Sequence, residues 1–159
     1  MRARQALRRL AAVERGVLAG LMAGIALTTF VQVVCRYAFN LPLQWSEEVA
    51  RFFLVWVTFV GSGTLLRDAT GHPKVDTVEQ SVSSRARSVL AAVSRVLVLI
   101  GCLAMAWGGV RMVALQWAQT SPSIEMSMGI VYLCIPVGAL LGVLWALVPP
   151  RALPPDDFR

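Results

Sequence analysis

The side chains best suited to chemistry are concentrated in one short segment, residues 36–51. Its charged, aromatic and amide members are Arg36, Tyr37, Phe39, Asn40, Trp45, Glu47, Glu48 and Arg51. Two adjacent carboxylates suggest acid–base catalysis or a cation site. Consecutive residues of a helix point about 100° apart, however, so Glu47 and Glu48 would not converge on one atom. The pair is therefore a weak candidate for metal binding or proton relay.

Other catalytic constellations lack the necessary residues. His72 is the only histidine, so bis-histidine haem ligation cannot be built from this chain alone. It stands beside Gly71 and Pro73 in a predicted cytoplasmic segment, where we expect a local turn or cap role rather than a serine–histidine–acid site. Cys35, Cys102 and Cys134 are odd in number and lie within or beside apolar runs, which argues against a disulfide framework and a zinc site. We therefore expect no enzymatic activity, no cofactor and no metal.

The composition indicates a membrane protein. Of the 159 residues, 57% are hydrophobic and only 15% are charged, an apolar share far above that of an average soluble domain. A soluble core of this length could not hide so many apolar side chains, because a small domain keeps much of its surface exposed. The net charge of +6 does not favour nucleic-acid binding, since the basic residues lie outside the apolar runs.

The expected fold is all-α, a polytopic membrane protein with four transmembrane helices. The predicted spans are about 16–35, 46–66, 95–117 and 126–148. The first has 20 residues without a charge, and roughly 30 Å of helix matches the thickness of the hydrocarbon core. These spans form one domain over 16–148, between a basic N-terminal tail at 1–15 and a short charged C-terminal tail at 149–159.

Local signals refine the elements. Ser46 is the predicted N-cap of the second span, where the following acids suit the helix dipole. Pro136 lies inside the last span and is expected to kink it, because proline removes one backbone hydrogen bond. Valines recur at helical spacing after Pro73, which predicts a short amphipathic cytoplasmic helix on the membrane surface or on a partner.

The cluster at 36–51 allows two interpretations at a membrane boundary. In the first, its aromatic residues belong to the interfacial belt, and Glu47 and Glu48 pair locally with Arg51. In the second, these charges face another helix, because unpaired charge facing lipid is costly. Arg111 is likewise either an interface anchor or a partner-facing residue. The candidate partner interface comprises Arg36, Tyr37, Trp45, Glu47, Glu48, Arg51 and Arg111.

Basic residues predict the orientation. Of the 15 lysines and arginines, 12 lie in the N-terminal tail, the 67–95 segment and the C-terminal tail. The remaining three lie in the segments 36–51 and 111–125, which the predicted spans place on the opposite side of the membrane. Since Lys and Arg are retained on the cytoplasmic side, both termini are expected to be cytoplasmic.

The cluster at 36–51, with motifs in the later spans, resembles the sequence pattern of the DctQ-like small permease subunit of tripartite ATP-independent periplasmic (TRAP) transporters. The matching motifs are Arg36-Tyr37 with Phe39-Asn40, Trp45-Ser46-Glu47-Glu48 with Arg51, Trp56 and Phe59 with Gly61, His72 with Val75-Asp76, and Tyr132 with Pro136-Val137-Gly138. They cover nearly the whole chain in the order found in that family. Ser127 departs from the pattern, because the family often has proline before the last span.

This resemblance implies a complex of three parts. A large DctM-like permease subunit would carry the solute, and a soluble DctP-like periplasmic binding protein would deliver it. The present chain would scaffold the large subunit in the bacterial inner membrane and help the binding protein dock. The resemblance further implies that a sodium gradient drives uptake and that the solute is an organic acid.

Two other functions remain open at this stage. The first is a self-sufficient small exporter made of four helices, acting as a homodimer. Such a protein usually needs a membrane-embedded ionisable group, which the first and fourth predicted spans lack. The second is a membrane anchor for an enzyme, although a single histidine disfavours a haem-bearing anchor.

Overall fold

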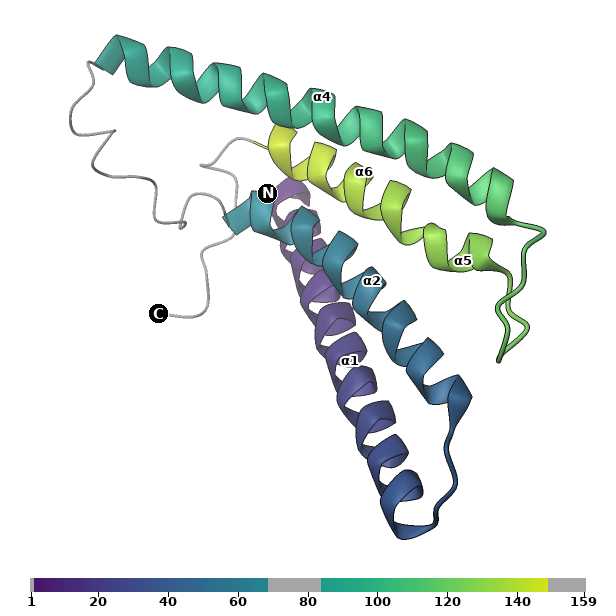
Figure 1. The fold of residues 1–159 in the computed structure, drawn as a ribbon. Helices are drawn as coiled ribbons and strands as arrows, with labels where there is room; N and C mark the ends of the chain where they lie inside the picture. Colours follow the sequence, from purple (N-terminus) through teal and green to yellow (C-terminus); the bar gives the residue numbers. More distant parts are fainter. Residues whose placement is uncertain (1, 69–83, 149–159) are drawn as a thin grey trace.

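The structure, a computed structural model, describes residues 2–68 and 84–148 (Figure 1). Its helices are α1 (Arg2–Ala38), α2 (Gln44–Asp68), α4 (Ser84–Gln116), α5 (Met128–Tyr132) and α6 (Cys134–Leu147). Within these two ranges, four stretches are long and apolar enough to cross a membrane. They are Arg4–Ala38, Gln44–Arg67, Val89–Gln116 and Met128–Leu147. The prediction of an all-α, multi-pass membrane protein is confirmed.

Two of the helices are much longer than one bilayer crossing requires. α1 has 37 residues and α4 has 33, which correspond to roughly 55 Å and 50 Å of helix. Because the hydrocarbon core is only about 30 Å thick, such helices must tilt or extend beyond it. The basic segment predicted as an N-terminal tail is helical from Arg2. Most of the predicted amphipathic helix after Pro73 and the tail at 149–159 lie outside the described residues.

The helices pack as an open row rather than a closed bundle. α1 packs on α2, α2 packs on α6, and α6 packs on α4 (Figure 1). Consequently α6 is covered on two sides, whereas none of the most apolar stretch of α1 or α4 is buried. On α4, Trp107 and Leu115 are 71% and 72% exposed. This much exposed apolar surface is suited to lipid or to another membrane subunit.

Small residues let α6 occupy the middle of the row. A Cβ atom added at Gly138 would collide with the backbone carbonyl of Phe59 in α2. On the other side, a Cβ at Gly109 of α4 would lie 2.8 Å from Cδ of Pro136. Because lipid tails are as apolar as leucine, membrane helices associate largely through such close packing of small residues.

The last span is divided into two helical segments just before its proline, in the region where the sequence predicts a kink. α5 ends at Tyr132 and α6 begins at Cys134. Pro136 has no N–H for the carbonyl of Tyr132, and its ring crowds that carbonyl four residues earlier. The chain nevertheless stays helical through Leu133, with φ −56° and ψ −25°, so the two segments act as one span.

The α1–α2 connection depends on an asparagine. Asn40 has φ 54°, a left-handed conformation that asparagine tolerates better than most residues. Next to it, the N–H of Leu41 donates to the carbonyl of Cys35 at 3.0 Å, which satisfies one of the last carbonyls of α1. The chain thus reverses within five residues and begins α2.

The prediction that Ser46 caps the second span was wrong. α2 begins two residues earlier, at Gln44. Ser46 is completely buried, and its Oγ donates to the carbonyl of Leu43 at 2.7 Å instead of accepting from a helix N–H. The hydroxyl therefore ties the first turn of α2 to the preceding loop.

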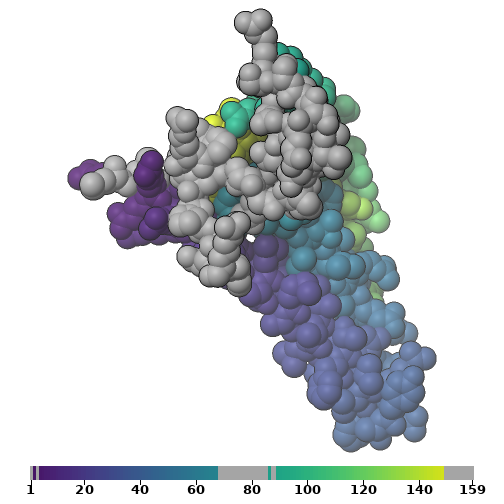
Figure 2. All heavy atoms as spheres, turned by 90° about the vertical axis from the view of Figure 1, so that its left-hand side faces the viewer, coloured from purple at the N-terminus to yellow at the C-terminus, as the bar shows by residue number. Residues whose placement is uncertain are grey.

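The molecule has two distinct ends. We call the end where α1 begins and α6 ends the terminal end, and the opposite end, with the α1–α2 and α4–α5 connections, the loop end. Figure 1 shows the α1–α2 hairpin and the α4–α6 hairpin close together at the terminal end and diverging toward the loop end. Figure 2 shows the α1–α2 connection, in blue, projecting away from the remaining helices.

Candidate functional site

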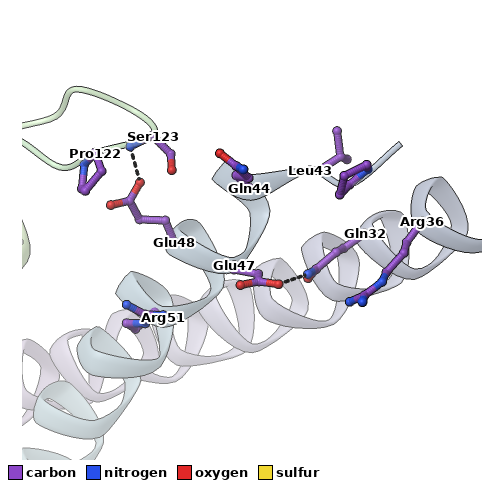
Figure 3. A pocket seen from close by; sticks show the side chains of 10 residues that line it. Gln32, Arg36, Leu43, Gln44, Glu47, Glu48, Arg51, Pro122 and Ser123 are labelled. Carbon is purple, nitrogen blue, oxygen red and sulfur yellow. Dashed lines mark hydrogen bonds between the residues drawn. The ribbon is translucent and has the colours of Figure 1, made fainter. Parts of the chain in front are cut away.

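A pocket of about 310 Å³ at the loop end contains most of the charged residues that the sequence singled out (Figure 3). We call it the polar pocket. Its lining residues come from α1, the two loops and the first two turns of α2: Gln32, Arg36, Pro42, Leu43, Gln44, Glu47, Glu48, Arg51, Pro122 and Ser123. Three separate segments of the chain therefore meet at this site.

Each acidic residue of the polar pocket connects α2 to a different segment. Nε2 of Gln32 in α1 donates to Oε1 of Glu47 at 2.8 Å. The backbone N–H of Ser123, in the α4–α5 loop, donates to Oε2 of Glu48 at 3.0 Å. Glu48 thus joins the two hairpins at the loop end, where the helices themselves have separated (Figures 1 and 3).

Local pairing of these acids with Arg51, one of the two interpretations of the cluster, does not occur among the described residues. Within the described part of the chain, the ion pair between side chains is that of Arg67 with Glu14, and neither Glu47 nor Glu48 takes part in one. Arg51 is exposed at the edge of the polar pocket. In place of a pair along the helix, Glu47 accepts from a side chain of α1 and Glu48 accepts from the backbone of the α4–α5 loop.

The structure divides the predicted interface residues into two groups. Arg36, Glu47, Glu48 and Arg51 line the polar pocket. The other three predicted residues lie on the surface outside it: Tyr37, Trp45 and Arg111. Tyr37 is 77% exposed, as expected for an aromatic side chain in the interfacial belt or against a partner.

The chemistry available in the polar pocket is recognition rather than catalysis. Two arginines and two glutamates give it both signs of charge and no net charge. In the part of the chain that the structure describes, no three histidine, cysteine, aspartate or glutamate residues gather as a metal site would require. The pocket could therefore hold a polar group that donates to carboxylates and accepts from guanidinium groups.

An apolar groove of about 390 Å³ lies between the two hairpins. Aromatic and aliphatic side chains line it almost exclusively: Leu21, Val49, Phe52, Phe53, Trp56, Ile124, Met126, Ile130 and Val131. It occurs because α2 separates from the second hairpin toward the loop end (Figure 1). We call it the apolar groove.

At the terminal end, three buried side chains from three helices form a cluster. Nε1 of Trp145 in α6 donates to Oε1 of Glu14 in α1 at 2.8 Å. Nη1 of Arg67 in α2 donates to Oε2 of the same carboxylate at 3.4 Å. The Arg67 guanidinium also lies over the Trp145 ring, 5.4 Å from its centroid. We call this group the buried cluster.

The buried cluster was missed at the sequence level. Its members are 53 and 131 residues from Glu14 along the chain, so no local spacing brings them together. Glu14 lies in an arginine-rich segment, and Arg67 follows directly after an apolar run. The sequence contained one signal. If the first helix includes Glu14, this single acid beside the first apolar run needs a partner.

Comparison with known proteins agrees with this architecture. A 26% identical relative, over 111 residues, is a putative TRAP transporter small permease protein of Haemophilus influenzae, with 70% of this chain and 67% of that protein covered. A second protein of the same name and organism is 22% identical over 121 residues, covering 76% of this chain and 74% of its own length. The isethionate TRAP transporter permease protein DctMQ of Oleidesulfovibrio alaskensis is 25% identical over 130 residues, which are 76% of this chain but only 20% of that protein.

The family described as tripartite ATP-independent periplasmic transporters, DctQ component, matches residues 25–149. This match includes the polar pocket, the lining of the apolar groove except Leu21, and all of α2, α4, α5 and α6. With most of its length matched and with four helices able to cross a membrane, this chain belongs to the DctQ family of TRAP transporter small permease proteins.

Proposed function

We propose that this chain scaffolds a large DctM-like permease subunit in the bacterial inner membrane and helps a DctP-like periplasmic protein dock. The complex would take up an organic acid at the expense of a sodium gradient. The observation that carries the scaffold role is the open row of helices, in which the apolar stretches of α1 and α4 are uncovered. A subunit that packs beside a larger one needs such faces.

The relative from Oleidesulfovibrio alaskensis supports a large partner. That protein is a single permease chain, DctMQ, and the present sequence matches one fifth of it. A DctQ-like part joined to a much larger permease part indicates that the two work side by side. For the present chain, the same arrangement would arise by association of separate subunits.

The distribution of ionisable groups also favours a supporting role. A membrane-embedded group that binds and releases ions must be able to change its partners. Glu14 and Arg67 instead bind each other and Trp145 in the buried cluster. Sodium and solute sites are therefore assigned to the large subunit.

The polar pocket is the proposed meeting point with partners. Since 12 of the 15 basic residues lie on the side of the termini, the positive-inside rule makes that side cytoplasmic and the loop end periplasmic. A periplasmic binding protein would approach from the loop end. There it would meet exposed Arg36 and Arg51 beside the acids of the polar pocket.

Alanine substitution tests this assignment. Glu47→Ala, Glu48→Ala and Arg51→Ala, made singly, should reduce recovery of the large subunit with the tagged chain, or reduce uptake by the complete system. Arg95→Ala is the matched control, because Arg95 is exposed on α4 and lies outside the polar pocket. Unaltered recovery and uptake in all three variants would remove the interface role.

A further inference from the structure

The polar pocket and the apolar groove are consecutive along one face of α2. Gln44 and Glu48 line the polar pocket, whereas Phe52 and Trp56 line the apolar groove. These four residues are spaced by four, so they form one row on the helix surface. The row changes from polar to apolar between Glu48 and Phe52.

One loop borders both cavities. Pro122 and Ser123 line the polar pocket, and the next residue, Ile124, lines the apolar groove. The loop is held by its own backbone, since the N–H of Ser121 donates to the carbonyl of Met126 at 2.9 Å. The polar pocket and the apolar groove therefore adjoin beside the same loop. Together they suit one amphipathic molecule.

The charges of the polar pocket select a headgroup with both signs. Arg36 and Arg51 form no ion pair with a described residue, and their guanidinium groups are suited to a phosphate. Glu47 and Glu48 each use one carboxylate oxygen in the hydrogen bonds already described. Their other oxygens can accept N–H bonds from a primary ammonium group. A purely anionic headgroup would supply no cationic partner for the two carboxylates.

The dimensions suit one leaflet. Glu48 and Trp56 are eight residues apart, or roughly 12 Å along the helix axis. Half of the hydrocarbon core is about 15 Å. A molecule with its charged end at Glu48 and its apolar end at Trp56 would therefore lie along the helix as a lipid lies in a leaflet.

We propose that the polar pocket and the apolar groove together form a binding site for one phospholipid with a zwitterionic phosphoethanolamine headgroup. The phosphate lies between Arg36 and Arg51, the ammonium group faces Glu47 and Glu48, and an acyl chain fills the apolar groove. The lipid occupies the space that opens between the hairpins and supports their separation at the loop end. The polar pocket is also the proposed meeting point with partners, but every residue of the lipid site belongs to the present chain, so lipid binding can be measured on this chain alone.

Native mass spectrometry of the purified full chain tests the headgroup preference. After delipidation in detergent, the chain is titrated with phosphatidylethanolamine, phosphatidylcholine or phosphatidylglycerol carrying identical acyl chains. We expect one tightly bound phosphatidylethanolamine per chain, with affinity at least roughly tenfold above that for phosphatidylcholine, which lacks N–H donors. Equal affinity for all three lipids, or no lipid bound, would overturn the proposal.

Variants then locate the bound lipid. Arg36→Gln together with Arg51→Gln should abolish the preference, whereas Arg95→Gln together with Arg111→Gln, outside the polar pocket, should keep it. Val49→Trp and Ile130→Trp fill the apolar groove from opposite hairpins. Each should weaken binding roughly tenfold or more, while Leu97→Trp on exposed α4 should not. Loss of binding in the control variants, or full binding in the filled ones, would contradict this location even if the preference held.

Discussion

Glu14 is the residue on which three helices depend at the terminal end. Its carboxylate accepts from Arg67 of α2 and from Trp145 of α6, and its own relative exposure is only 3%. A buried charge is tolerated when it is paired and hydrogen-bonded, but removing one member leaves the other uncompensated. The buried cluster therefore fixes the geometry of α1, α2 and α6 relative to one another.

Glu14→Gln should lower the free energy of unfolding by about 3 kcal/mol, because the buried ion pair between Glu14 and Arg67 would lose its negative charge. Thermal unfolding of the purified chain in detergent, followed by tryptophan fluorescence, measures the effect as a reduced Tm. Glu125→Gln is the control, since Glu125 is exposed in the α4–α5 loop. Equal Tm values for the two variants would show that the buried cluster does not stabilise the fold.

At this scale, part of the candidate site could be predicted from the sequence. Residues 36–51 are the predicted functional segment, and four of its six candidate interface residues line one pocket. Their partners were not predictable, because Gln32 and Ser123 come from other elements. Helical spacing proposed a pair between the acids and Arg51, but hydrogen bonds to neighbouring elements were available to both acids. Glu14 was overlooked because its segment was interpreted as a tail.

At the scale of the elements, α6 is the centre of the row because its glycines permit close approach on both sides. Gly138 lies against the backbone of Phe59 in α2, and Gly142 lies against Cys102 of α4. A backbone contact cannot move aside as a flexible side chain can. The α2–α6 contact is therefore the most sensitive packing site in the described structure.

Gly138→Ala should destabilise the chain by about 1–3 kcal/mol, since the added Cβ forces α2 and α6 apart. Gly101→Ala provides a matched comparison, because nothing lies within 4 Å of a Cβ at Gly101 of α4. Its effect should be neutral or slightly stabilising, as alanine is the better helix former. The same unfolding measurement distinguishes them. Similar losses in both variants would argue against tight α2–α6 packing.

The sequence predicted the number and type of these elements because uninterrupted apolar runs have few alternatives in a membrane. The ends of the helices were harder to predict, since hydropathy locates the part of a helix that lies inside lipid and says little about where the helix stops. α1 and α4 continue through charged residues that marked boundaries in the sequence. The row order was not predictable, because it depends on contacts between distant small residues.

At the scale of the whole molecule, the open row has surface that no part of its described structure covers. Residues such as Leu97, Trp107 and Leu115 on α4 are more than half exposed. In the membrane, these positions must meet lipid or another subunit. The orientation of the chain in the membrane then determines whether the loop end faces the periplasm or the cytoplasm, and so which partners it can contact.

Reporter fusions test the proposed orientation. A fluorescent protein at either terminus should fold and fluoresce, because both termini are expected in the cytoplasm. Alkaline phosphatase, which needs the disulfide-forming periplasm, should be inactive there. The same enzyme fused after Pro42, in the α1–α2 loop, should be active. Active phosphatase at both termini and an inactive fusion after Pro42 would reverse the assignment of the loop end.

Under the proposed function, this DctQ-family chain works as one subunit beside a large permease. The most direct measurement is the mass of the complex recovered when the tagged chain is co-expressed with the large TRAP permease of the same organism and purified from membranes. We predict one copy of each subunit in a stable complex, which Gly138→Ala should weaken more than Gly101→Ala. Recovery of the chain solely as a homodimer, with the large permease absent, would contradict the account.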